Sequence, residues 1–280
     1  MKTVADALGV SRSQLHERLK GEPKPRTRYQ KADEAEHLAT IRTLTDGRPT
    51  YGYRRIWALL NRQRTATNQP KLNHKRVYRL MSQNGLLLRR YTGKPPGRAH
   101  DGKVITIRPN LRWTTDGFEF TCWNKEIVRV MFGLDTCDRE VMAWTASTGG
   151  LTGEMARDVM VQSVEQRFGS VTSVPHPIQW LSDNGSCYRA KETIAFGQSL
   201  GLIPCFTPVR SPQSNGMAEA FVKTFKRDYV YVNDRPDAKT VLAQLPGWFE
   251  DYNENHPHKG LRMKSPREFI RSFQPAACPV

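Results

Sequence analysis

The order of apolar segments after residue 104 constrains the fold more than any other feature of this 280-residue sequence. Three segments rich in β-branched and aromatic residues follow one another with turn residues between them, which predicts an antiparallel meander. These segments span residues 111–120, 127–135 and 141–148. Next come, in order, a helix at 152–168, a strand at 178–182, a helix at 190–200, a strand at 202–207 and a helix at about 217–231. This succession predicts a layered α/β fold.

Positive charge is concentrated in the first third of the chain. Residues 1–103 hold 23 Lys and Arg against 8 Asp and Glu, whereas residues 104–280 hold 20 against 19. A basic part joined to a nearly neutral part is typical of a nucleic-acid-binding module attached to another domain. The alternative is a charge that only aids solubility, although acidic residues would serve that purpose as well or better.

Several other classes of protein are disfavoured by composition. No run of about 18 apolar residues occurs, so we expect no transmembrane helix, and the N-terminal residues lack the apolar region of a signal peptide. The 5 cysteines are scattered and form no CxxC pair, which argues against a disulfide framework and a structural zinc module. We therefore expect a protein of the reducing cytoplasm.

The first 21 residues have the pattern of a partial helix-turn-helix. Two stretches with helically spaced apolar residues flank a break at 9–11, and Ser11 is the expected N-cap of the second helix. On that helix, Arg12 and Arg18 are candidate DNA contacts. Any short helical hairpin could show the same pattern, and the supporting helix that usually precedes such a pair is missing from this sequence.

A second helical unit is predicted over residues 33–90, between basic linkers at 22–32 and 91–103. Its last helix is expected to begin after an Asn73 cap. Four basic residues on the outer faces of its helices are candidate DNA contacts, with an ordinary solvated helix face as the alternative. They are Arg54, Arg55, Lys75 and Arg76.

Three acidic residues stand out by their positions. Asp116 lies in the first strand, Asp183 ends the short buried strand, and Glu219 lies in the first turns of the last long helix. An acid directly after an apolar strand is costly unless it is paired or bound to a metal. Three convergent carboxylates suit Mg²⁺ or Mn²⁺. Two such ions about 3.5–4 Å apart can act on the attacking and leaving oxygens of a phosphodiester.

The same acids carry a resemblance to a known family, because 35 residues separate Asp183 from Glu219. The matching segments within residues 112–269 are RWTTDGFEF, FGLDTCDRE, WLSDNGSCYRA, RSPQSNGMAEAFVKTFKRDY and YNENHPHKGLRMKSPREF. In them the sequence resembles the DDE transposases of bacterial insertion sequences, from the branch assembled from two overlapping reading frames. These share their core with retroviral integrases.

The resemblance implies a fold and a division of the chain. An RNase H-like integrase catalytic core, with a mixed sheet flanked by helices, would occupy residues 104–272, followed by a tail at 273–280. The small helical DNA-binding units would precede it. Asp116, Asp183 and Glu219 would then be the catalytic triad and the ligands of Mg²⁺ or Mn²⁺, with two ions in each active site.

Residues next to the triad receive supporting roles. Lys223 and Lys226 follow Glu219 at i+4 and i+7 on one helix face, and in the related proteins this face meets the DNA end. A solvated helix face is the alternative for both lysines. Asn184 and Gly185 are expected to let the chain turn beside Asp183, and Asn215 and Gly216 to set the loop before the helix of Glu219.

The implied function is that of a transposase catalytic subunit, which cleaves and joins DNA strands at the ends of an insertion sequence. Its partners would be double-stranded DNA of terminal repeats and target, a second copy in a synaptic dimer, and the product of an upstream reading frame, because the chain looks like the downstream-frame product. Location in the cytoplasm, on the nucleoid, is expected. Two alternatives remain: a DNA-binding regulator without chemistry, and an RNase H-like nuclease without strand joining.

Overall fold

The computed structural model describes residues 2–19, 33–89, 106–169, 173–207 and 215–272. The linkers expected at 22–32 and 91–103 and the tail expected at 273–280 lie outside these ranges. The chain divides into two compact units, Met1–Thr40 and Ile41–Val280. Over the described ranges, no helix combines the length and the apolar character needed to cross a bilayer. The four cysteines in these ranges are free thiols.

The first unit contains the predicted helical pair. Helix α1 spans Lys2–Ala7 and helix α2 spans Arg12–Leu19. The Ser11 hydroxyl accepts a hydrogen bond from the backbone N–H of Gln14 at 3.2 Å, so Ser11 is the predicted N-cap. Between the helices, Gly9 has a φ of 63°, a conformation that costs glycine little.

Helix α3 (Glu34–Gly47) leads into the second unit, in which α4 (Tyr53–Ala66) and α5 (His74–Gln83) follow. The predicted Asn73 cap is present, because its side chain accepts a hydrogen bond from the N–H of Lys75. Apolar side chains from these helices and their connections form a small core. Its buried members are Ile41, Tyr51, Ile56, Leu60, Leu72, Val77, Leu80 and Met81.

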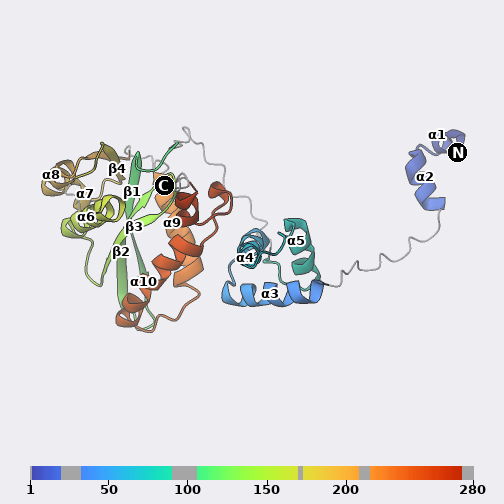
Figure 1. Ribbon diagram of the computed structural model, residues 1–280, viewed down its shortest axis with the longest axis horizontal. Coiled ribbons are helices and arrows are strands. Elements are labelled where there is room, and N and C mark those ends of the chain that lie inside the picture. Colours follow the sequence, from blue (N-terminus) through green and yellow to red (C-terminus); the bar gives the residue numbers. More distant parts are fainter. Residues whose placement is uncertain (1, 20–32, 90–105, 170–172, 208–214, 273–280) are drawn as a thin grey trace, which may run out of the picture. The chain divides into compact units, whose positions relative to one another are not determined.

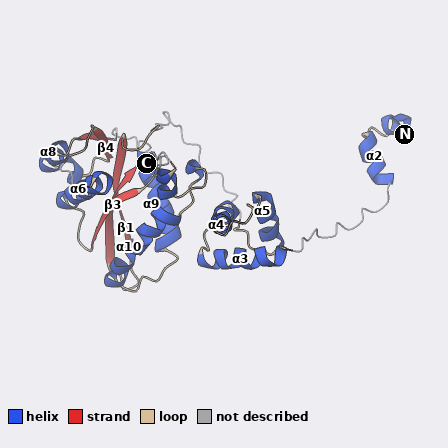
Figure 2. Ribbon diagram, in the orientation of Figure 1, coloured by secondary structure: helices blue, strands red, loops and turns tan. Residues whose placement is uncertain are grey.

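A five-stranded mixed sheet forms the centre of the larger domain (Figures 1 and 2). Its strands are β1 (Arg112–Thr121), β2 (Ile127–Asp135), β3 (Val141–Ser147), β4 (Ile178–Ser182) and β5 (Leu202–Phe206). Their order is β3-β2-β1-β4-β5. The first three strands pair antiparallel, as predicted, whereas β4 pairs parallel to both β1 and β5.

Helices cover both faces of this sheet (Figure 1). One face carries α6 (Gly153–Phe168), α7 (Ser186–Arg189) and α8 (Lys191–Ser199). The other carries α9 (Gly216–Phe225), the π-helical turn η2 (Lys226–Val230) and α10 (Ala238–Asn255). The short elements η3 (Lys259–Leu261) and α11 (Pro266–Arg271) follow α10. The predicted α/β architecture is therefore confirmed, with a π-turn where one continuous α-helix was expected.

Alternation along the strands separates two apolar cores. Phe118 and Phe132 point toward α9 and α10, where Phe221 and Phe225 pack against them. Trp113 and its neighbours point to the opposite face, toward α6 and α8. Side chains along the central strands therefore alternate between the two faces of the sheet, and this places the acidic residues described next.

Candidate active site

Asp116 of β1 lies beside Asp183, at the carboxyl end of β4. In the parallel pairing of β1 with β4, Trp113 is opposite Trp180 and Thr114 is opposite Leu181. The same offset continued by two residues brings Asp116 level with Asp183, which follows directly after the end of β4. Asp116 lies in the middle of β1, two residues beyond its last pair with β4, so both acids lie at the carboxyl edge of β4.

Glu219 approaches the same edge from the helical layer. Asp116 has the strand parity of Phe118, which faces α9 and lies 5.8 Å from the Phe225 ring. Helix α9 begins at Gly216, and Glu219 lies in its first turn. A carboxylate in a first turn is stabilised by the positive end of the helix dipole. The fold thus brings together three acids from β1, the end of β4 and the start of α9.

The electrostatics of Asp116 reflect this convergence. Its pKa is raised to about 6, chiefly because the carboxyl is buried, and further because Asp183 and Glu219 add negative charge nearby. The N–H of Gly117, which donates to Asp116 Oδ1 at 2.8 Å, opposes the rise. Glu219 has a cationic neighbour, since Lys223 Nζ lies 3.4 Å from its Oε2.

Backbone N–H groups donate hydrogen bonds to one carboxylate oxygen of each aspartate. The N–H of Gly185 donates to Asp183 Oδ1 at 2.9 Å, as Gly117 does to Asp116. A Cβ atom at Gly185 would lie 2.9 Å from that same Oδ1, so any larger residue would push the carboxylate aside. Asn184 donates to the carbonyl oxygen of Thr207 at 2.8 Å and ties the ends of β4 and β5 together.

The chemistry of these donors fits a hard divalent cation. Both aspartates use Oδ1 for a backbone N–H, and within the described ranges Oδ2 of each takes no hydrogen bond. Carboxylate oxygens are the ligands that Mg²⁺ and Mn²⁺ prefer. Among the described residues, however, no three acidic, histidine or cysteine side chains are already arranged to hold a metal ion. The carboxylates would have to turn toward a common point to bind one.

Family models cover most of the chain. An HTH-like domain matches residues 31–94, and two integrase core domain models match residues 107–212 and 200–266. The sequence is 50% identical over 272 residues to transposase InsD of insertion element IS2A/D/F/H/I/K from Escherichia coli, covering 96% of this chain and 90% of that protein. Transposase InsD of IS2-9 from strain K12 is also 50% identical, with 96% and 88% covered.

The chain belongs to the insertion-sequence transposases. The predicted enzyme class, a polynucleotidyl transferase, is confirmed by this membership. A solved structure of a simian T-cell lymphotropic virus intasome, in complex with a PP2A regulatory subunit, supports the fold. It has a TM-score of 0.50 at 17% identity and covers 87% of this chain and 77% of that one.

The basic residues predicted to contact DNA differ in how exposed they are. Lys226 is half-buried, with its ammonium 5.7 Å from the centre of the Phe118 ring. Arg12, Arg54 and Lys75 have exposed side chains, and Arg76 is half-buried. The side chain of Arg18 lies outside the described residues. Gly216 is the first residue of α9. Roles in DNA binding stay predictions for all of these basic residues.

Arg55 lies in an ion pair rather than on a free surface. Its Nη1 is 2.8 Å from Asp228 Oδ2. Two more arginines seven positions away on either side are also paired: Arg48 with Asp251, and Arg62 with Glu268 at 2.6 Å. The proposed DNA contact of Arg55 therefore competes with an acid of its own chain, which sequence patterns did not indicate.

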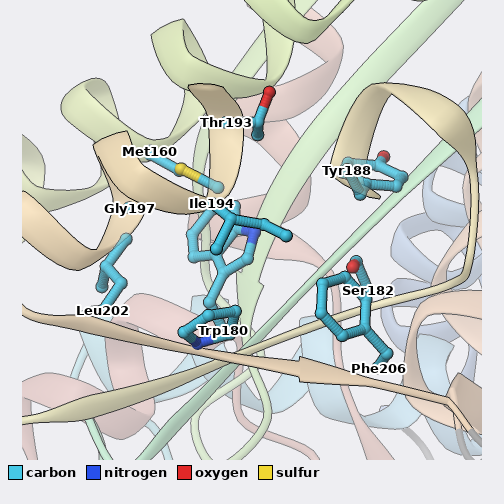
Figure 3. A pocket seen from close by; sticks show the side chains of 10 residues that line it. Met160, Trp180, Ser182, Tyr188, Thr193, Ile194, Gly197, Leu202 and Phe206 are labelled. Atoms are coloured by element: carbon cyan, nitrogen blue, oxygen red, sulfur yellow. The ribbon is translucent and has the colours of Figure 1, made fainter. Parts of the chain in front are cut away.

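A largely apolar pocket lies next to the acidic edge (Figure 3). Ser182 and Tyr188, on either side of Asp183 in sequence, help to line it, together with Trp180. None of its lining side chains is charged. The pocket is therefore not where the transposase would hold a cation, and the open edge with three carboxylates remains the candidate site.

Replacing Asp116 by Asn is expected to stabilise the transposase when no divalent cation is present. The folded-state pKa of Asp116 lies above its unfolded value, so its charge destabilises the fold to the full extent above about pH 6, and this penalty declines as the pH falls from about 6 to about 4. At pH 8 with a chelator, Asp116→Asn should raise the free energy of unfolding by about 1–3 kcal/mol. Near pH 4 the difference should be small.

Urea unfolding at both pH values measures this effect. Asp158→Asn is the matched control, because Asp158 lies exposed on α6. A loss of stability in Asp116→Asn at pH 8, or an equal gain in the control, would contradict the electrostatic description of the site.

Proposed function

We propose that this transposase cleaves DNA strands at the ends of its insertion sequence and joins the freed 3′ end to another strand. Asp116, Asp183 and Glu219 act in this proposal as the catalytic triad and hold one or two Mg²⁺ or Mn²⁺ ions. The observation that carries it is the convergence of the three carboxylates: burial raises the pKa of Asp116, and the charges of Asp183 and Glu219 raise it further.

The residues around the triad have defined tasks. A bound divalent cation would compensate the negative charge that develops on the attacking and leaving oxygens of the phosphodiester. The amides of Gly117 and Gly185 fix one oxygen of each aspartate and leave the other for the cation. Lys223 on α9 and Lys226, the first residue of η2, would contact phosphates of the DNA end. No serine or tyrosine nucleophile is required, because the attacking group is a hydroxyl of water or DNA.

The helical units would hold the terminal repeats. Arg12, Arg18, Arg54, Lys75 and Arg76 are the proposed contacts, mainly to phosphates, and binding should weaken as salt rises. Two ends must be paired for strand transfer, so a dimer is the proposed working form. The product of an upstream reading frame, or a fusion with it, is the further proposed partner, and the cytoplasmic nucleoid is the proposed location.

The proposal is tested by strand joining on a branched DNA that mimics a joined end, with Mn²⁺ as the cation. The native chain is compared with Asp183→Asn, which keeps the shape of the side chain and removes its negative charge. Joining by the native chain and its loss in the variant is the expected result. Equal activity of the two proteins would overturn the assignment of Asp183.

Two other outcomes lead to the alternatives. DNA binding without any reaction, even after addition of an upstream-frame product, would indicate a regulator. Hydrolysis of the branched DNA by the native chain without joining would indicate a nuclease with the same core.

A further inference from the structure

A buried polar junction links the three elements that carry the catalytic acids. The side chain of Asn215, which is 6% exposed, accepts a hydrogen bond from the hydroxyl of Thr114 through Oδ1 and donates to the carbonyl oxygen of Thr115 at 3.2 Å through Nδ2. The Thr114 hydroxyl also lies 3.4 Å from the carbonyl oxygen of Leu181. Helix α9, strand β1 and strand β4 therefore meet at one amide and one hydroxyl.

The side chain of Asn215 forms this junction instead of a hydrogen bond with the first turn of its own helix. It is the N-cap residue of α9, and an asparagine at this position commonly accepts a hydrogen bond from an N–H of the first helical turn. Here no such side-chain bond forms. The side chain reaches instead to residues about a hundred positions earlier in the chain. A hydrogen-bonding group fully removed from water and satisfied at both ends fixes the distance between the elements that it joins.

The residues of this junction precede the three acids by two to four positions in the sequence. Thr114 precedes Asp116 by two residues and shares its face of β1, and Leu181 precedes Asp183, the residue that follows β4, by two. Asn215 precedes Glu219 by four residues, about one helical turn. The ladder between β1 and β4 already sets the spacing of the two aspartates. The Asn215 contacts join the start of α9 to β1, in addition to the apolar packing of Phe221 and Phe225 further along the helix.

We propose that Asn215 and Thr114 are positioning residues that hold the start of α9 beside the two aspartates, from where Glu219 can turn toward a shared divalent cation. The inference rests on the proposed function, because it takes the three carboxylates as cation ligands. Groups that orient metal ligands typically change affinity by about 10–100-fold when they are removed. The effect should therefore be a change in cation affinity rather than a change in the contacts with DNA.

The test compares Mn²⁺ affinity, measured by electron paramagnetic resonance on the full chain, with the Mn²⁺ dependence of strand joining. Asn215→Ala and Thr114→Val are both expected to weaken Mn²⁺ binding by about 10–100-fold, and a higher Mn²⁺ concentration should recover part of the joining. The double variant should lose little more than either single variant, because both remove one shared junction.

Thr193→Val is the matched control. Thr193 is fully buried in the same domain, and its hydroxyl has no hydrogen-bond partner within the described residues. Unchanged Mn²⁺ affinity in Thr114→Val, which preserves side-chain shape, would overturn the positioning role even if Asn215→Ala failed to fold. If the native chain neither binds Mn²⁺ nor joins DNA, the proposed function fails first. If it does both and the variants match it, the positioning role alone fails.

Discussion

Glu219→Gln should lower the rate of strand joining by at least about 10²–10³-fold, the typical cost of removing one group that stabilises a charged transition state. Glutamine keeps the length of the side chain and its place in the first turn of α9. It removes one of the three negative charges that would hold a cation beside Asp116 and Asp183. The reaction would thus lose its cation while the fold and the DNA-binding units stay intact.

DNA binding separates this effect from a folding defect. Glu219→Gln should bind terminal-repeat DNA without a cation at least as tightly as the native chain, because a carboxylate no longer repels the phosphates. Glu192→Gln is the control, since the Glu192 side chain is 87% exposed on α8. Joining assays and gel-shift titrations on the same preparations give both readouts. Joining at the native rate would remove Glu219 from the active site.

The second large effect is expected at Arg167, which is not part of the candidate active site. Its replacement should lower the free energy of unfolding. Its guanidinium lies 2.8 Å from Asp138 and 3.3 Å from Glu140, and all three side chains are buried. Asp135 is also buried nearby, and burial together with the Asp138 charge raises its pKa against the opposing effect of Arg167. Arg167→Met would leave buried carboxylates without this cation, at a cost of about 3–5 kcal/mol.

A second arginine on the same helix provides the comparison. Arg157 lies 3.7 Å from the exposed Glu192, so Arg157→Met should cost about 0–1 kcal/mol. Urea unfolding followed by circular dichroism measures both variants. The penalty in Arg167→Met should shrink at acidic pH, because protonation neutralises the buried acids. Similar losses in the two variants would show that the buried acids do not depend on Arg167.

Local patterns predicted most of the fold. The strands, the antiparallel meander and the caps at Ser11 and Asn73 depend on periodicity and neighbouring residues, which the sequence displays directly. The three acids could be selected because charged residues beside apolar strands are uncommon without a partner. Helix α7 could not be predicted, since four residues are too few to show helical periodicity.

Long-range partners account for the rest. Asp138 accepts a hydrogen bond from the N–H of Glu140, close to it in sequence, but its cationic partner is Arg167, 29 positions away. The roles of Thr114 and Leu181 could not be predicted from the sequence. A threonine in a strand and a backbone carbonyl are common features, and only the folded structure brings them to Asn215. Such pairings depend on how distant segments come together.

The paired arginines before and along α4 change how this transposase responds to ionic strength. Arg48, Arg55 and Arg62 already pair with Asp251, Asp228 and Glu268, and Arg55 shares Asp228 with Arg227. A cation occupied in this way displaces no counterion from a DNA phosphate, and counterion release sets the slope of affinity against salt. The number of counterions released from DNA on binding should therefore be smaller than the number of Lys and Arg in residues 1–103 suggests. The unpaired lysines and arginines determine that slope.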